Sequence, residues 1–273
     1  MDMKYSVLMS VYIKEKAEYL DQSLRSMVDQ TVFPDEIVIV EDGPLTTELQ
    51  AVIESYDNEF PGLINIVKLE KNGGLGNALN YGIDACRNEL IARMDSDDIA
   101  KSDRCEKQLY AFKSTPELSI VGTQIEEFIG DKENVVSSRI VPTTYCEIMK
   151  FSRRRSPFNH PTVMYRKSEL NRVGKYRTWG RKEDLDLFIR MLHSDCKAIN
   201  LKESLLWYRA GEDNLRRRKT WVNCKEYIQI MWGFFLKGYI GLSDIIYVVV
   251  GQLAMYLMPA TIAERVSKKY LRN

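Results

Sequence analysis

The chain has 273 residues, of which 45% are hydrophobic and 28% charged. This composition excludes an intrinsically disordered protein, and the length allows one large α/β domain or a core with a smaller appendage. The net charge of +1 is unevenly spread, because residues 1–149 carry 14 basic and 27 acidic side chains whereas residues 150–273 carry 25 and 11. This division favours a metal site in the front half and a polyanion or anionic surface for the back half, with chance segregation of surface charge as the alternative.

The cysteines and the N-terminus indicate the compartment. Five cysteines without C-x-x-C spacing, and histidines that are not clustered, favour reduced thiols over a disulfide framework or a zinc site. The first residues, MDMKYSVLMSVY, lack a basic region followed by a long apolar stretch, so they predict a strand and no signal peptide. We therefore expect a cytoplasmic protein.

Short apolar runs alternate with helical patterns through the first half of the chain. The predicted strands are 5–11, 36–40, 64–67 and 90–94, and the predicted helices are 16–29, 46–59 and 75–86. This repeat predicts right-handed crossovers and a mostly parallel sheet with helices on both faces. Ligands bind such sheets at the carboxyl ends of the strands, where SVY, EDGP and MDSDD each follow a predicted strand.

The second half is less regular. Its predicted strands are 135–141, 162–165 and 205–209, and its clearest predicted helix is 183–193. The tail from residue 221 to 258 is rich in apolar and aromatic residues, and its second apolar run, 245–258, has 14 residues. A bilayer span needs about 20, so this run predicts a buried helical hairpin or an interfacial helix with a basic flank.

The segment MDSDD places Asp95, Asp97 and Asp98 directly after a predicted strand. Carboxylates this close repel one another, and their hard oxygen atoms select Mg²⁺, Mn²⁺ or Ca²⁺. An EF-hand is disfavoured because Ala100 stands where its loop needs glycine. Two interpretations stay open: a metal completed by substrate phosphates, and a helix cap in which Asp98 or Ser102 caps the next helix.

Two further segments could contact a nucleotide. EDGP is either a simple turn or a strand end where the Asp42 carboxylate accepts hydrogen bonds from a nucleoside. KNGGLGNALNYGI places Asn72 and Gly73 before a helix, where backbone amides can approach a phosphate. The second segment is neither GxGxxG nor a P-loop, which disfavours a Rossmann dehydrogenase or an NTPase.

Acidic residues also begin the predicted helix in RKEDLDLFIRML. The helix dipole favours Glu183 and Asp184 in the first turn, so a structural role is available beside one in which Asp184 points into a cleft. A histidine without clustered partners, such as His160 in NHPTVMY, is more typical of a structural hydrogen bond than of a catalyst.

The segment WYRAGEDNLRRRK gathers basic side chains after the last predicted strand, namely Arg209, Arg216, Arg217, Arg218 and Lys219. One interpretation is a solvated basic loop. The other is a segment that closes over a diphosphate with arginine forks.

The segments SVLMSVY, IVIVEDGP, NGGLGNALNYGI, ARMDSDD and KEDLDLFIRM, in this order and spacing, resemble the family 2 glycosyltransferases. NHPTVMYR further resembles bacterial members that build exopolysaccharide, capsule or lipopolysaccharide. The resemblance implies an inverting enzyme with a GT-A-type, Rossmann-like α/β fold over residues 1–218, divided into a nucleotide-binding half (1–100) and an acceptor half (101–218). Residues 219–273 would then form a C-terminal helical region. The lack of a QxxRW motif favours transfer of single sugars over polymerisation.

The resemblance also implies roles for individual residues of the donor site. Asp42 would contact the base of the nucleotide, and the loop at Val11 and Tyr12 would line the same pocket. Asp95 and Asp97 match the DxD motif of the family. Asp97 would bind a Mn²⁺ or Mg²⁺ ion, and Asp95 would reach the ribose or a metal-bound water.

The general base implied by the resemblance is Asp184, the second residue of an ED motif that begins with Glu183. Asp98 would assist the metal site, and His160 is a further candidate in the same region. The donor-binding set is completed by Asn72, Gly73, Arg216 and Arg217.

The implied reaction moves one sugar from a nucleoside-diphosphate sugar, with uridine diphosphate favoured, to a hydroxyl of a glycan or lipid-linked acceptor. We expect it at the inner face of the cytoplasmic membrane and without nucleic acid. One rival is a sugar nucleotidyltransferase, whose Gly-rich N-terminal loop is missing from SVYIKEKAEYL. Another is a non-catalytic nucleotide-binding relative, against which the intact Asp95, Asp97 and Asp184 argue.

Overall fold

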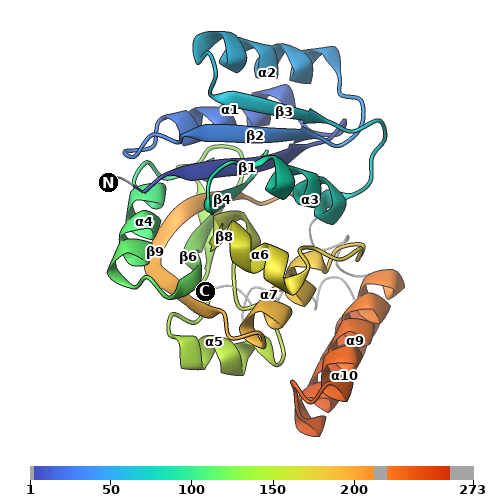
Figure 1. The fold of residues 1–273 in the computed structure, drawn as a ribbon. Helices are drawn as coiled ribbons and strands as arrows, with labels where there is room; N and C mark the ends of the chain where they lie inside the picture. The colour runs from blue at the N-terminus through green and yellow to red at the C-terminus, as the bar shows by residue number, and fades with distance from the viewer. Residues whose placement is uncertain (1–2, 212–219, 259–273) are drawn as a thin grey trace.

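The first half of the chain forms a parallel sheet with helices on both faces (Figure 1). The computed structural model describes residues 3–211 and 220–258. Strands β1 (Tyr5–Val11), β2 (Glu36–Glu41), β3 (Ile64–Lys68) and β4 (Leu90–Asp95) lie in the order β3-β2-β1-β4. Helices α1 (Ala17–Val28), α2 (Thr47–Glu59) and α3 (Leu75–Ala85) connect them. The elements predicted for this half are thus confirmed to within one or two residues.

Strands β1, β2 and β4 are buried on both sides, which explains their mostly apolar sequences, whereas the edge strand β3 is only partly covered. In β1, Val7 and Met9 pack in the core that includes α1 and α2, and Leu8 packs in the core on the α3 side. Because β1, β2 and β4 are parallel, their carboxyl ends lie at one edge. The segments that follow these strands therefore meet there.

The second half adds a mixed sheet. Strands β8 (Met164–Arg166) and β6 (Leu118–Phe128) extend the order antiparallel from β4. Strand β9 (Lys197–Arg209) pairs parallel with β6. The strand β5 (Ile99–Ala100) pairs antiparallel with β9, and β7 (Val135–Arg139) pairs antiparallel with β6. The prediction missed β6 and gave only the last five residues of β9. It also began β8 too early, because residues His160–Thr162 form a 3₁₀ turn before the strand.

The described helices packed around this mixed sheet are α4 (Arg104–Ser114), α5 (Tyr145–Ser152), α6 (Lys167–Val173) and α7 (Glu183–Leu192). Helix α7 has two apolar faces that pack against different parts of the protein. Leu187 and Phe188 pack in the core beside α3, whereas Leu185 and Ile189 pack against the C-terminal helices. The first turn of α7 therefore lies between the sheet and those helices.

The C-terminal helices α9 (Trp221–Leu236) and α10 (Leu242–Leu257) form a hairpin beside α7 (Figure 1). Ile230, Phe234 and Ile245 are buried against α7. The opposite side is apolar and exposed, with Ile246 54% and Val250 61% accessible. The structure thus has a helical hairpin over residues 221–257, but only one of its faces is buried, so the predicted buried hairpin is confirmed only in part. Within the described ranges, no helix combines the length and apolarity that a membrane crossing needs.

Candidate active site

The loop after β3 is tied to the end of β2 through Asp42. The Asp42 carboxylate accepts hydrogen bonds from the backbone amides of Gly73, at 2.7 Å, and Gly74, at 3.1 Å. The Asn72 side-chain amide donates to the Asp42 carbonyl at 3.2 Å. Gly43 permits this approach, because its φ is +85° and a Cβ there would lie 2.7 Å from the Asn72 nitrogen. The structure thus brings together three residues predicted for the donor site.

The strand-one loop lies beside this contact. The Asp42 amide donates to the Val11 carbonyl at 2.8 Å, and the Val11 side chain is buried. Tyr12 is 38% exposed and available to a ligand. The backbone amides of Gly73 and Gly74 lie in the segment predicted to approach a phosphate, but they donate to Asp42 instead.

Three carboxylates gather after β4. One oxygen atom from each of Asp95, Asp97 and Asp98 lies within 4.8 Å of the others. Burial, and then the charge of Asp95, raise the pKa of Asp97 to about 7. Burial, and then the charge of Asp97, raise the pKa of Asp98 well above its usual range. The positive charge near the cluster is therefore too small to keep all three carboxylates ionised at neutral pH.

The helix-cap interpretation of Asp98 is wrong. Helix α4 begins at Arg104 after Asp103, without a side-chain cap, and β5 separates it from the acidic loop. The Asp98 carboxylate instead accepts the backbone N–H of Arg209 at 2.9 Å. Its role is to join the acidic loop to the end of β9.

Arg209 fixes the acidic loop from the side of β9. Its Nε donates to the Asp97 carbonyl at 2.8 Å, and its Nη2 donates to Gln22 of α1 at 2.6 Å. Its guanidinium also stacks on the ring of Tyr19, 3.9 Å from the centroid. Sequence reasoning grouped Arg209 with the basic segment, whereas the structure gives it a positioning role. Arg216 and Arg217 lie outside the described residues, so their clamping role stays a prediction.

A buried arginine, Arg93, faces the cluster from inside β4. Its side chain is 1% exposed and donates from Nη2 to the Asp95 carboxylate. Its Nε and Nη1 have no hydrogen-bond partner among the described residues. Arg93 was not among the residues predicted for the site. The signal was available, because a buried charge inside an apolar strand needs a partner.

The candidate base lies in the first turn of α7. Asp184 accepts a hydrogen bond from Ser156 Oγ at 3.2 Å. The neighbouring Glu183 is buried, and its Oε2 has no partner in the described parts of the chain. Burial, and then the charge of Asp184, raise the pKa of Glu183 to about 7. Of the two carboxylates, Asp184 is the one that lines a cavity.

His160 is held in the protein interior. Its Nε2 lies 2.8 Å from the hydroxyl of Tyr176, and its ring packs edge-on against Phe188. Burial, and then the charge of Arg93, hold the pKa of His160 well below its usual range. The imidazole is therefore neutral and hydrogen-bonded, as expected of a structural histidine.

A cavity of about 190 Å³ joins the acidic loop to the candidate base. Asp95 and Arg93 line it from β4, and Asp184 lines it from α7. Asn159 also lines it, and its buried Oδ1 has no partner among the described residues. The remaining lining residues are Leu75, Ile125, Glu127, Arg139, His160, Pro161 and Tyr208. The cavity offers donors, acceptors and carboxylates around a space suited to a small polar molecule.

The acidic loop also suits a divalent cation. Its three carboxylate oxygens approach one another as hard ligands of one ion would. Asp98 Oδ2 is buried without a hydrogen-bond partner in the described ranges, which leaves a proton or a cation to satisfy it. Asp95 and Asp97 would hold such an ion, with Asp98 behind them.

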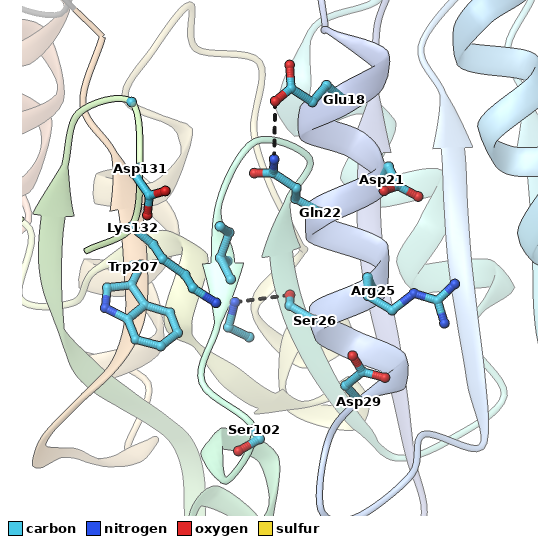
Figure 2. Close-up of a pocket in the computed structure, with 13 residues that line it drawn as sticks. Glu18, Asp21, Gln22, Arg25, Ser26, Asp29, Ser102, Asp131, Lys132 and Trp207 are labelled. Atoms are coloured by element: carbon cyan, nitrogen blue, oxygen red, sulfur yellow. Dashed lines mark hydrogen bonds between the residues drawn. The ribbon is translucent and has the colours of Figure 1, made fainter. Parts of the chain in front are cut away.

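A larger groove of about 660 Å³ lies elsewhere, between α1 and the end of β9 (Figure 2). Figure 2 shows Gln22 and Ser26 of α1 facing Lys132 and Trp207 across it. None of the residues that line it was predicted for the site. The smaller cavity is the better candidate, because it contains the carboxylates placed for chemistry.

Comparison with known proteins identifies the family. The model of Glycosyl transferase family 2 matches residues 6–180. The UDP-Gal:alpha-D-GlcNAc-diphosphoundecaprenol beta-1,3-galactosyltransferase of Escherichia coli is 35% identical over 273 residues, covering 99% of this chain and 97% of that protein. The amylovoran biosynthesis glycosyltransferase AmsE of Erwinia amylovora is 39% identical over 226 residues, covering 83% of this chain and 84% of that protein.

The fold is shared with solved structures as well. TarS 1-349 of S. aureus in complex with UDP-GlcNAc matches with a TM-score of 0.67 at 19% identity, over 98% of this chain and 76% of that chain. This likeness supports the GT-A-type fold alone. Because the family model matches residues 6–180, well over half of the chain, the chain is a member of glycosyl transferase family 2.

Proposed function

We propose that this enzyme transfers one sugar, with inversion, from a nucleoside-diphosphate sugar to a hydroxyl of a lipid-linked or glycan acceptor in cell-surface polysaccharide synthesis. The observation that carries the proposal is the cavity that Asp95 and Asp184 both line. A carboxylate at the donor end and another at the acceptor end are what a direct displacement requires. The printed names of the E. coli relative and the TarS complex favour a UDP-sugar.

Asp184 is the proposed general base. Its carboxylate lines the cavity, and Ser156 Oγ donates to one of its oxygens. The other oxygen has no hydrogen-bond partner among the described residues and can accept a hydrogen bond from an acceptor hydroxyl. A positioned base of this kind contributes about 10²- to 10⁴-fold to the rate. Since one displacement inverts the anomeric centre, no covalent intermediate is needed.

Asp95 and Asp97 are the proposed ligands of a Mn²⁺ or Mg²⁺ ion. When bound, such an ion neutralises the charge of the departing nucleoside diphosphate. Arg93 holds Asp95 from behind, and Arg209 holds the backbone of Asp97. Asp42 and Tyr12 are the proposed contacts of the nucleoside.

We expect UDP to stabilise the protein in a metal-dependent way, by about 2.7 kcal/mol at a hundredfold excess over the dissociation constant. The effect should also depend on pH. The pKa of Asp97 in the folded chain, about 7, lies above its unfolded value of about 3.9, so the folded state holds this proton more tightly. The stability of the metal-free protein therefore falls as pH rises between these two values. The metal needs the ionised form, and its affinity should fall about tenfold from pH 8 to pH 6.

Differential scanning fluorimetry with UDP and Mn²⁺ at pH 6 and pH 8 measures this effect. The matched control is UDP with EDTA at each pH. A shift that is equal with and without Mn²⁺ would contradict the metal site, and one that is larger at pH 6 would contradict the protonation of the acidic loop.

We also propose that the exposed face of the α9–α10 hairpin lies on an anionic bilayer. Leu242, Ile246 and Val250 are spaced by four residues and are each more than half exposed. Asp244, the only charged residue of α10, is turned inward and paired with Arg154. The sequence that follows α10 adds basic residues, which anionic lipids attract by about 1 kcal/mol each. Apolar face and basic flank together suit an interfacial helix.

We expect the double variant Ile246→Ser and Val250→Ser to bind vesicles about tenfold more weakly, because burying each apolar side chain contributes roughly 1 kcal/mol or more. Co-sedimentation with phosphatidylglycerol vesicles measures the binding. Tyr110→Ser, at a 71% exposed position of α4, is the control. Unchanged vesicle binding, or conversion of a wild-type dimer to a monomer by the double variant, would show that the face has another partner.

A further inference from the structure

Two buried polar side chains on the wall of the 190 Å³ cavity keep hydrogen-bonding atoms without partners. Arg93, on β4, is 1% exposed, and its Nε and Nη1 have no hydrogen-bond partner among the described residues. Asn159 is fully buried, and its Oδ1 is likewise unpartnered in the described ranges. Polar atoms buried this deeply are normally hydrogen-bonded, so we expect their partner inside the cavity that both side chains line.

The orientation of the Asn159 amide is set by its other contacts. Its Nδ2 donates to the Thr123 carbonyl of β6 at 2.9 Å and to the Arg139 carbonyl of β7 at 3.3 Å. Its own carbonyl accepts the Thr162 hydroxyl at 2.8 Å and the Thr162 amide at 2.9 Å. Because Nδ2 faces two carbonyl oxygens, turning the amide over would place its oxygen against them. Oδ1 is therefore the atom left for a ligand.

Arg93 is held beside the same turn. Its backbone amide donates to the Val163 carbonyl at 2.9 Å, directly after the 3₁₀ turn that follows Asn159. Its Nη2 donates to the Asp95 carboxylate. That pairing balances the charge of Asp95 and leaves the two other nitrogen atoms idle. The cavity thus receives donors from β4 and an acceptor from the neighbouring turn.

The cavity lies where the transferred sugar has to be. Asp95 lines it from the end of β4, and Asp184 lines it from α7. In a direct displacement the anomeric carbon stands between the leaving phosphate and the attacking hydroxyl, so the sugar occupies the space between the acidic loop and the base. The volume of about 190 Å³ is below the roughly 300 to 1,000 Å³ of pockets for drug-sized ligands, which suits one sugar ring.

We propose that Arg93 and Asn159 bind hydroxyl groups of the donor sugar, with Arg93 donating to a hydroxyl oxygen and Asn159 accepting a hydroxyl proton. This inference rests on the proposed function. A hydroxyl both donates and accepts, so it matches an idle guanidinium and an idle amide oxygen on one wall. An analogue without that hydroxyl leaves buried atoms unpaired, and sites of this kind reject such analogues strongly. The pair therefore selects hexoses whose hydroxyl at the Asn159 position is free.

The test is a double-mutant cycle between protein and sugar, measured by isothermal titration calorimetry with Mn²⁺ and without acceptor. The ligands are UDP, UDP-galactose and the UDP-galactose analogues with fluorine in place of the 2-, 3-, 4- or 6-hydroxyl. Fluorine cannot donate a hydrogen bond, so the analogue at the position held by Asn159 should bind the wild type about tenfold more weakly than UDP-galactose. In Asn159→Ala the same replacement should change the dissociation constant less than about twofold, because the acceptor is already gone. If the wild type binds UDP-glucose more tightly than UDP-galactose, the UDP-glucose analogues are used.

Arg93→Lys separates sugar binding from the support of Asp95. Lysine keeps a positive charge beside Asp95 but cannot place donors where Nε and Nη1 lie. We expect the dissociation constant of UDP to change less than about threefold and that of UDP-galactose to rise about tenfold. A role as counter-ion alone predicts equal and small changes for the two ligands.

Thr162→Val is the matched control for Asn159→Ala. Thr162 Oγ1 accepts the Thr123 amide at 3.0 Å and donates to the Asn159 carbonyl, but Thr162 is not among the described residues that line the cavity. Both substitutions disturb the same buried turn, so both variants should melt below the wild type. Only Asn159→Ala should lose the discrimination between UDP-galactose and its fluoro analogue.

Three results would overturn the inference: fluoro analogues that all bind the wild type as UDP-galactose does, the same loss of discrimination in Thr162→Val, or equal weakening of UDP and UDP-galactose in Arg93→Lys. The first would assign the buried atoms to water, and it needs no variant, so it decides even if Asn159→Ala does not fold. Failure of the proposed function has a different signature, namely a wild type that binds neither UDP nor the UDP-hexoses with Mn²⁺. The inference then falls with it, whereas UDP binding without selection among the analogues overturns the inference alone.

Discussion

Replacing Asp184 with Asn is expected to lower kcat about 10³-fold and to leave donor binding unchanged. The Asn side chain has nearly the same shape, and its carbonyl oxygen can still accept the hydrogen bond from Ser156. It cannot take a proton from the acceptor hydroxyl. The loss should therefore appear in the chemical step, with the dissociation constant of UDP and Mn²⁺ preserved.

Steady-state transfer from a radiolabelled UDP-sugar measures kcat, and calorimetry measures UDP binding. Glu183→Gln is the comparison variant, because Glu183 is the adjacent carboxylate and is buried with a pKa of about 7. We expect it to lose less than tenfold. If Glu183→Gln abolished transfer while Asp184→Asn retained it, the base would be Glu183.

Replacing Asp97 with Asn should have two opposite effects. Metal-dependent UDP binding should weaken about a hundredfold, because a neutral amide is a much poorer ligand for Mn²⁺ than a carboxylate. The melting temperature of the metal-free protein at pH 8 should rise, since the substitution removes a buried charge that burial and Asp95 both oppose. If Asp97 served the structure alone, its replacement would lower the melting temperature and leave metal-dependent UDP binding unchanged.

Calorimetry of UDP with Mn²⁺ and thermal unfolding in EDTA at pH 8 measure the two effects. Asp103→Asn is the control, because Asp103 is a nearby, partly exposed carboxylate paired with Lys107. It should change neither UDP binding nor the response to Mn²⁺. A metal-free Asp97→Asn protein that melts below the wild type would contradict the view that the ionised Asp97 carboxylate destabilises the fold.

The nucleotide half of the fold was predictable because its strands β1, β2 and β4 are buried on both faces and its helices are amphipathic. Strand β6 was missed for a physical reason. Its sequence LSIVGTQIEEF places polar side chains in the interior, and their partners come from distant segments. Gln124, for example, bonds both the amide and the carbonyl of Val141. No local pattern reveals such pairing.

The candidate site shows the same division. Asp95, Asp97 and Asp184 could be placed from motif order, and the structure brings the first and last of them to one cavity. Arg93 and Asn159 were not found, because their importance depends on burial beside partners remote in the sequence. The function of Arg209 was misjudged, because the acidic loop it holds lies more than a hundred residues earlier.

The bonds from Gly73 and Gly74 to Asp42 have a further consequence for the nucleotide pocket. They fix the start of α3 to the end of β2 before any donor arrives. A wall that is already ordered has little conformational entropy left to lose on binding, so more of each contact with the donor appears as affinity. The pocket is in this respect assembled during folding, and the ligand meets a preorganised surface.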